Sequence, residues 1–504
     1  MGANNYKPLQ TGYSRVFLLE GRAKPTTVPA YQSQLKMTGL SQSFGDITKI
    51  EIPDPNTYDG FIEVDSIRGA TERMTTSLVG RYAAAMRSKL LELARNGCAS
   101  DVQLHIGECV DPSAFNVYTK ALILEDVIVT NYGTEDLGAL GSDERAKVDE
   151  TADISIKDAY EVVPLSFSLK ASSIMTTEVV DVVIYDTKSC GTCDTESDGC
   201  QKIFAVTITG SGSPAPTADV VFSKDGGVTW YAQDVDTMST ESPTGIAGLG
   251  DYIVVTSAGA TTYGLHYALE TDFSATGNPA FTRVSTGFTT NGEPNAIFSL
   301  GRKAFIVGDY GYVYYTEDAT AAVSVLDAGV ATISALKAVH AYDEDHAIAV
   351  GDFGTVIYTT NKTGWAATAT KPVNTVGTNL TGCYMRSESE WWVTSSAGKL
   401  YYTTDSGTSW TEKVLPGTTP TALYDVQFST PSVGYAAGVV SAHGRIWRTI
   451  DGGYSWFVLP EVGTMPATDK FEALAPCKYD ANFVVAAGLA DDGVDGAIVV
   501  GSAT

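Results

Sequence analysis

The sequence contains few basic residues and no long apolar run. Its 504 residues include 33 Lys and Arg against 59 Asp and Glu, so the formal net charge is −26. Proteins that hold nucleic acid by its phosphates need clustered Lys and Arg, so the balance argues against that class. No apolar run approaches the ~20 residues that cross a bilayer, and residues 1–17 lack the basic and apolar regions of a signal peptide. We expect a soluble protein, made in a cytosol, that binds no membrane.

Cysteine is also scarce, and the odd count of seven does not suggest a fold built on disulfides. Three cysteines lie together in the segment SCGTCDTESDGC, at Cys190, Cys193 and Cys200. They could bind zinc if Cys98 or Cys109 supplied a fourth ligand. A structural cross-link or free thiols are the alternatives, and neither requires a metal.

The second half of the chain is repetitive. The segments GYVYYTEDAT, GTVIYTTNKT, GKLYYTTDSG and GRIWRTIDGG begin at Gly311, Gly354, Gly398 and Gly444, and from Gly264 the period is about 43 to 52 residues. Each repeat has room for about four short strands, which is typical of a β-propeller blade. Seven copies of the central strand predict about seven blades, and incomplete first and last copies predict a ring closed by strands from both ends of the repeats.

Three copies end in the same motif, Ser/Thr-x-Asp-x-Gly-x-Thr/Ser-Trp, between the third and fourth predicted strands. Asp bonds nearby backbone amides, Gly adopts positive φ without strain, and Trp covers the turn as the next strand begins. We therefore predict a structural role for all nine residues rather than a catalytic one. They are Asp225, Gly227, Trp230, Asp405, Gly407, Trp410, Asp451, Gly453 and Trp456.

This motif resembles the Asp box, or bacterial neuraminidase repeat, of sialidase-like propellers, with degenerate copies at Asp318 and Asn361. The style of GDFGTVIYTT is similar to propellers related to the photosystem II assembly factor. The resemblance covers about residues 205–504 and implies a propeller domain at 204–504. It implies little about activity.

An enzyme is not expected. Sialidases bind a carboxylate with three arginines, the first usually in an Arg-Ile-Pro stretch that this chain lacks. The propeller half contains only Arg283, Arg302, Arg386, Arg445 and Arg448. The five histidines are scattered and form no zinc motif, and GDYGYV and GDFGTV lack the Lys and helix of a phosphate loop. We predict no catalytic residues, no cofactor and no assigned metal site.

Residues 1–203 differ in character from the repeats. Strands are predicted in RVFLLEGRA, DVQLHIGE, KALILEDVIVTNYG and YEVVPLSFSLKA. Tyr82, Met86, Leu90 and Leu93 recur at helical spacing. A long acidic segment, GTEDLGALGSDERAKVDETADISIKD, reads as a loop.

One helix with a β-sheet assembly, an N-terminal arm and a long acidic loop resembles the tail tube proteins of long-tailed phages, over about residues 10–200. The fold class expected is therefore mainly β, with a tail-tube-like sandwich or barrel before the propeller. The resemblance implies hexameric rings stacked into a tube for DNA, with contacts to other tail proteins such as the tape measure, in a virion tail assembled in the host cytoplasm. The propeller would project outward, and acidic surfaces would keep DNA from adhering.

Two other functions remain open from the sequence. A propeller could bind surface glycans or a host, which exposed aromatics such as Trp391 and Trp392 would support, although one of the pair must point inward on a strand. A glycoside hydrolase is the least favoured.

Overall fold

The computed structural model describes strands within residues 14–163 and most of residues 165–503. In the first part it covers residues 14–19, 31–35, 39–43, 50–53, 61–64, 74–80, 94–95, 100–106, 120–134, 150–156 and 158–163. In the second part the gaps are residues 171–177, 186–201, 210–216, 239–240, 260–261, 278, 290, 373–377, 460–469 and 490–495. The chain forms two compact units, residues 1–164 and 165–504, and each is described by itself.

The first unit is an antiparallel sheet in the order β2-β1-β7-β8-β9-β6-β3, with β10 also paired to β8. The long strand β8 organises it, because its first half pairs with β7 and β10 and its second half with β9. Ile123 and Leu124 are neighbours on β8 and are both buried, so this strand is covered on both faces. A separate hairpin consists of β4 and β5. The strands are β1 (Ser14–Leu19), β2 (Tyr31–Leu35), β3 (Gly39–Ser43), β4 (Ile50–Pro53), β5 (Phe61–Val64), β6 (Met74–Gly80), β7 (Ser100–Ile106), β8 (Lys120–Thr134), β9 (Glu150–Ile156) and β10 (Asp158–Val162).

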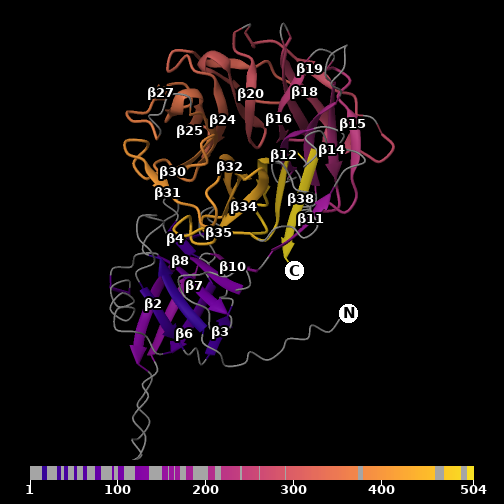
Figure 1. Cartoon of the computed structure of the whole chain (residues 1–504). Helices are drawn as coiled ribbons and strands as arrows, with labels where there is room; N and C mark the ends of the chain where they lie inside the picture. Colours follow the sequence, from indigo (N-terminus) through magenta and orange to yellow (C-terminus); the bar gives the residue numbers. More distant parts are fainter. Residues whose placement is uncertain are drawn as a thin grey trace, which may run out of the picture. The chain divides into compact units, whose positions relative to one another are not determined.

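The second unit is a seven-bladed β-propeller, which confirms the predicted blade count. Seven four-stranded antiparallel sheets follow one another, and the innermost strand of each contacts the innermost strand of the next (Figure 1). We number the blades I to VII from β12 and call their strands A to D from the innermost outward.

The strands of blades I to III are β12 (Val179–Tyr185), β13 (Lys202–Thr209), β14 (Thr217–Ser223), β15 (Tyr231–Asp234), β16 (Ser242–Leu249), β17 (Tyr252–Ala258), β18 (Gly264–Leu269), β19 (Thr282–Val284), β20 (Pro294–Leu300), β21 (Lys303–Gly308), β22 (Tyr312–Thr316) and β23 (Ser324–Ala328). Those of blades IV to VI are β24 (Leu336–Ala341), β25 (Ala347–Gly351), β26 (Thr355–Thr359), β27 (Ala366–Ala367), β28 (Leu380–Met385), β29 (Trp391–Ser395), β30 (Leu400–Thr403), β31 (Thr411–Lys413), β32 (Ala422–Phe428), β33 (Gly434–Val440), β34 (His443–Thr449) and β35 (Phe457–Val458). Blade VII consists of β36 (Lys470–Pro476), β37 (Val484–Leu489), β38 (Gly496–Ala503) and β11 (Leu165–Lys170). Three short 3₁₀ turns, η2 (Glu270–Asp272), η3 (Asp309–Gly311) and η4 (Asp352–Gly354), lie in blades II, III and IV.

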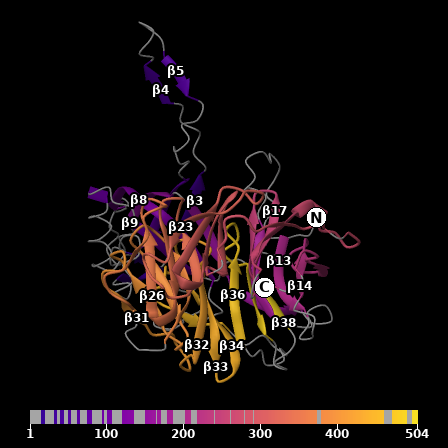
Figure 2. The ribbon, with the colours of Figure 1, turned by 90° about the horizontal axis from the view of Figure 1, so that it is seen from above.

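Strands from both ends of this unit close the ring, as the incomplete repeats predict. Strand β11 pairs with β38 from Leu165 opposite Ala503 to Lys170 opposite Ile498, and Figure 1 shows the two side by side. The A strand of blade VII, β36, also contacts β12 of blade I. Figure 2 shows the propeller strands from above, among them β32 and β36, the A strands of neighbouring blades VI and VII.

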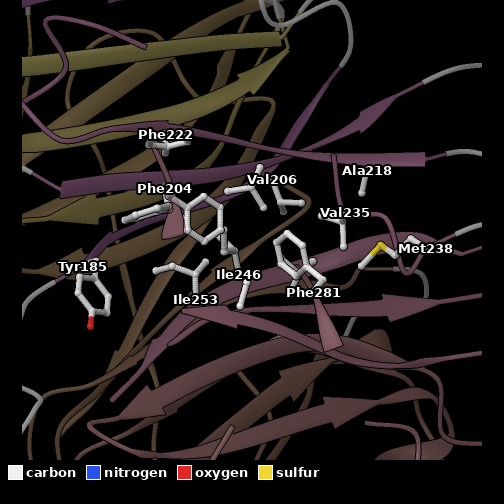
Figure 3. Close-up of a cluster of buried hydrophobic side chains, with 14 residues drawn as sticks. Tyr185, Phe204, Val206, Ala218, Phe222, Val235, Met238, Ile246, Ile253 and Phe281 are labelled. Carbon is white, nitrogen blue, oxygen red and sulfur yellow. The ribbon is translucent and has the colours of Figure 1, made fainter. Parts of the chain in front are cut away.

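The cores of the propeller lie between successive blades. One cluster joins Phe204 and Phe222 of blade I to Ile246, Ile253 and other residues of blade II (Figure 3). A similar cluster across the closure brings aliphatic side chains of blades VII and I together. Each blade is thus covered on both faces, and central strands are buried on both sides.

The antiparallel order of each blade gives the propeller two distinct ends. Connections between strands B and C, and between one blade and the next, lie at one end, which we call the BC face. Connections between A and B, and between C and D, lie at the other end, the CD face. This division decides which loops can form one surface.

Three sequence-based expectations for the first half need correction or fall outside the described residues. The segment YEVVPLSFSLKA is not one strand, because β10 belongs to the first unit and β11 to the propeller, so the compact boundary lies after residue 164 and not at 203/204. The acidic segment is not wholly a loop, because Glu150–Ile156 alternates polar and apolar residues and forms β9. Of the predicted helix only residues 94–95 are described, as helical, and the stripe from Tyr82 to Leu93 lies outside.

Candidate functional site

In the first full Asp box, between β14 and β15, the carboxylate of Asp225 accepts hydrogen bonds from residues of its own turn. Asp225 Oδ1 accepts hydrogen bonds from the amides of Val228 and Thr229 at 3.0 and 2.8 Å and from Ser223 Oγ at 2.8 Å. Its Oδ2 accepts one from Thr229 Oγ1 at 2.5 Å. Burial alone would raise the pKa of Asp225, but these hydrogen bonds lower it to about 2.

The other two boxes repeat this geometry at different depths. Asp405 and Asp451 each accept hydrogen bonds from the Thr two residues earlier and from the backbone and side chain of the Ser four residues later. Burial acts to raise the pKa of both carboxyls. The hydrogen bonds prevail at exposed Asp405, whose pKa is lowered, and burial prevails at Asp451, whose pKa is raised.

The glycines of the boxes lie against the preceding blade. Gly227, Gly407 and Gly453 have φ of 83°, 77° and 92°, which favours glycine. A Cβ on Gly453 would come within 2.3 Å of the Trp392 ring in blade V, and one on Gly227 within 2.9 Å of Val500 in blade VII. The box turns therefore also fill the seam between blades.

The box tryptophans close the turns in different ways. Trp230 donates from Nε1 to Gly227 O at 3.0 Å, and Trp410 donates to Thr370 O at 3.3 Å. Trp456 is buried against Trp392. In the degenerate copies, Asp318 accepts from the Thr320 amide and Asn361 from the Gly364 amide, so a turn remains without the full motif.

The cysteine cluster Cys190, Cys193 and Cys200 lies outside the described residues, so its zinc, cross-link and free-thiol alternatives stay predictions. Cys477, directly after β36, is disulfide-bonded, and Cys383 is a free, buried thiol. Within the part of the chain that the structure describes, no group of three or more His, Cys, Asp or Glu side chains could hold a metal ion. In the same part no helix is long and apolar enough to span a bilayer.

The arginines that a sialidase site would need are occupied locally and on separate blades. Four of them have these partners: Arg283 with Glu241, Arg302 with Asp318, Arg386 with Gly452 O, and Arg448 with Ala481 O. Each of these four side chains therefore has a partner within its own blade or in a neighbouring one.

Two buried carboxylates join the innermost strands across blade boundaries. Every A strand has a register shift near its start, and in blades I and VI the residue after it is aspartate. Asp181 Oδ2 accepts from the Ile246 amide of blade II at 2.9 Å, and Asp425 Oδ2 from the Leu474 amide of blade VII at 3.0 Å. Burial raises the pKa of Asp425 to about 6, and burial together with the charge of Asp425 raises that of Asp181 to about 7.

The expected exposure of Trp391 or Trp392 is wrong. Their side chains point to opposite faces of β29, yet both are buried, with 0% and 2% exposed. Trp391 packs against Tyr358 of blade IV and Trp392 against Phe428 of blade VI. The rule that one of two adjacent strand residues faces solvent fails here because neighbouring blades cover both sides of the sheet.

The two most exposed aromatic side chains of the described residues lie instead on the BC face of blades III and IV. Tyr310 and Phe353 occupy equivalent turns, GDYG and GDFG, and are 61% and 57% exposed. The connection between the two blades adds Val330 and Ile333, which are 88% and 79% exposed. We call these four side chains the apolar surface.

The connection that carries Val330 and Ile333 contacts both turns. A Cβ on Gly311 would meet Thr332 O at 1.9 Å, and one on Gly329 would meet Tyr310 O at 2.6 Å. At its other end, Ala335 O accepts the Asp352 amide at 2.9 Å. The apolar surface is therefore one continuous set of loops.

Two features of this surface stand out energetically. Tyr310 (φ 53°, ψ 26°) and Phe353 (φ 58°, ψ 32°) adopt the left-handed region, which costs a bulky residue ~1–2 kcal/mol. The loop between them is held in place, because buried Asp327 accepts the amides of Val330 and Ala331 at 2.6 and 3.1 Å. From the sequence, GDYGYV and GDFGTV were considered as phosphate loops and not as a binding surface. An aromatic residue at a turn position that suits Gly or Asn was the available signal.

Comparison with known proteins concerns the propeller. Residues 273–467 match the family described as photosynthesis system II assembly factor YCF48, which agrees with the resemblance of the repeats. No curated protein matches the chain. The match lies within the propeller, and the expected likeness of residues 10–200 to tail tube proteins gains no support.

Similar solved structures include "YCF48 bound to D1 peptide", with 15% identity, a TM-score of 0.49, and coverage of 68% of this chain and 96% of that chain. YCF48 from Cyanidioschyzon merolae has 15% identity and a TM-score of 0.47, covering 66% of this chain and 98% of that one. The GH74 xyloglucanase from Xanthomonas campestris has 14% identity and a TM-score of 0.46, with coverage of 65% and 52%. At these identities the similarities say nothing of activity.

Proposed function

We propose that this protein is a binding protein without catalytic activity, and that its propeller holds a protein partner on the apolar surface. The observation that carries the proposal is the exposure of Tyr310, Val330, Ile333 and Phe353 on one continuous set of loops. Contiguous exposed apolar side chains on a soluble protein are typical of interaction sites. Two of them also occupy strained backbone positions, and such strain persists where it serves a function.

The chemistry of the surface favours a protein partner over a glycan. Val330 and Ile333 are aliphatic and lie on the connection that contacts the turns of both aromatic residues. They offer a sugar no flat ring and no hydrogen-bond donor, whereas they pack well against apolar side chains of a protein. The fixing of their loop by Asp327 lowers the entropy lost on binding.

The proposal leaves out the two other predicted functions. The Asp-box carboxylates already serve their turns, which leaves them without an evident catalytic task. The tail-tube hypothesis, with its stacked rings and virion location, rests on the sequence of the first half alone and stays a prediction.

A selection experiment tests the proposal. A naive library of displayed random peptides is panned against the full chain, and enriched peptides are measured against a variant carrying Tyr310→Asn and Phe353→Asn. Asn tolerates the left-handed conformation, so the turns should persist. The matched control is Tyr342→Asn, which removes a tyrosine that is 50% exposed on the CD face.

We expect peptides that lose binding to the double variant and keep it for the control. The absence of such peptides contradicts the proposal. Binding in a parallel glycan array that depends on Tyr310 and Phe353, with no peptide enriched, would replace it with the glycan alternative.

A further inference from the structure

The equivalent turns of blades III and IV differ in how their aspartates are neutralised. In blade III, Asp309 Oδ1 accepts a hydrogen bond from Asn295 Nδ2 at 2.8 Å, and Lys337 Nζ lies 3.8 Å away. In blade IV, Asp352 Oδ1 is buried and has no hydrogen-bond partner among the described residues. The backbones are otherwise alike, since the amides of both aspartates bond a carbonyl of the preceding connection, at Glu293 and Ala335.

The strand register explains the difference. Asn295 and Lys337 both lie in the register shift of their A strands, and the next blade has Thr381 there. Lys337 lies near Asp309 of the preceding blade, and Thr381 donates its hydroxyl to Leu423 O at 2.7 Å. Asp352 is thus left without the amide donor and without a lysine in the place of Lys337. Lys371 Nζ lies on the same turn, but it donates to Phe353 O at 3.0 Å and to Thr355 Oγ1 at 3.4 Å and forms no ion pair with Asp352.

A carboxylate without an ion pair, next to an apolar surface, restricts what can bind there. Asp352 directly precedes Phe353, and its amide bonds the connection that carries Ile333. A partner that covers Phe353 would remove water from Asp352, and burying a carboxylate without a counter-charge is costly. A Lys or Arg on the partner would offset that cost, and the net charge of −26 would steer it to the protein.

We propose that the apolar surface binds a protein segment that combines apolar side chains with a Lys or Arg, and that this basic group pairs with Asp352. The inference rests on the proposed function and adds the chemistry of the partner. An acidic segment would be repelled, and a purely apolar segment would leave the carboxylate buried and unpaired.

The selected peptides test this inference. Those that depend on Tyr310 and Phe353 should be enriched in Lys or Arg, and Asp352→Asn should weaken their binding about tenfold, an effect that falls as salt rises. The control is Asp345→Asn, which removes the same charge from the exposed CD-face turn of the same blade and should change affinity little. Replacing the peptide's basic residue with Gln should make binding insensitive to Asp352→Asn.

Stability supplies a second readout. The Asp352 side chain makes no hydrogen bond with the described residues, so Asp352→Asn should leave the unfolding temperature unchanged or raise it. A lower unfolding temperature would indicate a structural role for Asp352 and count against the inference. The peptide in which Gln replaces the basic residue would then still show whether that residue pairs with Asp352. Peptides that need Tyr310 and Phe353 but carry no basic residue, or that bind Asp352→Asn equally well, overturn this inference alone. If no peptide requires Tyr310 and Phe353 for binding, both the proposed function and this inference are wrong.

Discussion

The two aspartates between innermost strands predict a stability that falls as pH rises. The pKa of Asp181 is about 7 and that of Asp425 about 6 in the folded protein, against an ordinary value of 3.8. A raised pKa means that the folded state holds the proton more tightly than the unfolded state. Its stabilising effect is complete below about pH 4 and is lost as pH rises toward 7. Because each pH unit in that window is worth ~1.4 kcal/mol, Asp181 alone accounts for a loss of about 2–3 kcal/mol between pH 5 and pH 8.

Asp181→Asn isolates this effect, since a neutral amide resembles the protonated carboxyl. At pH 5 we expect the variant to differ from the native protein by at most about 1 kcal/mol, the value of one hydrogen bond to Val182 or Ile246. At pH 8 we expect it to be more stable by about 2 kcal/mol. Urea unfolding followed by tryptophan fluorescence at several pH values measures both. Native and variant curves that stay parallel from pH 5 to pH 8 would refute the reasoning.

Three further predictions concern the fold. Asp451→Asn should lower the free energy of unfolding in urea by about 1–2 kcal/mol, and Asp225→Asn, at an exposed box, by less than about 1 kcal/mol. The difference arises because only Asp451→Asn leaves buried hydrogen-bond donors unpaired. Equal effects of the two variants would contradict this. A fragment of residues 204–504 lacks β11 and β12 and should show no cooperative unfolding transition in circular dichroism, whereas a fragment of residues 165–504 should unfold cooperatively. A cooperative transition in the shorter fragment would show that closing the ring with β11 and β12 is dispensable. In thermal unfolding, Trp392→Ala should lower the free energy of unfolding by about 3–5 kcal/mol, because it leaves a cavity in a buried core. Phe353→Asn should lower it by no more than about 1 kcal/mol, because the relief of backbone strain offsets the lost packing. A comparable loss of stability in both variants would place Phe353 in the core.

Much of the propeller was predictable because its turns repeat a motif. The Asp boxes give the position between strands C and D, and the spacing of their central strands gives seven blades. The closing strand could not be identified, because Leu165–Lys170 resembles any other half-buried strand and lies before the first box. Its partner strand β38 is more than three hundred residues away in the chain.

The site could not be predicted, for two physical reasons. Adjacent Trp391 and Trp392 suggested one exposed ring, but a blade is covered on both faces, so alternation along the strand carries no information about exposure. The aromatic residues in GDYG and GDFG were a signal in the sequence, but that Tyr310 and Phe353 belong to one surface follows only from their positive φ and from the contacts of the connection between them. That Asp352 Oδ1 has no hydrogen-bond partner among the described residues depends on which residues meet across two blade boundaries. The spacing of residues in the sequence does not reveal those contacts.

The most direct test of the proposed binding role is to map where a selected peptide contacts the unmodified protein. A peptide carrying a photoreactive side chain is cross-linked to the full chain, and the labelled residues are identified by mass spectrometry. The account predicts labels in residues 309–311, 329–335 and 352–354. Labels concentrated in the Asp boxes, elsewhere on the CD face or in residues 1–164 would contradict it.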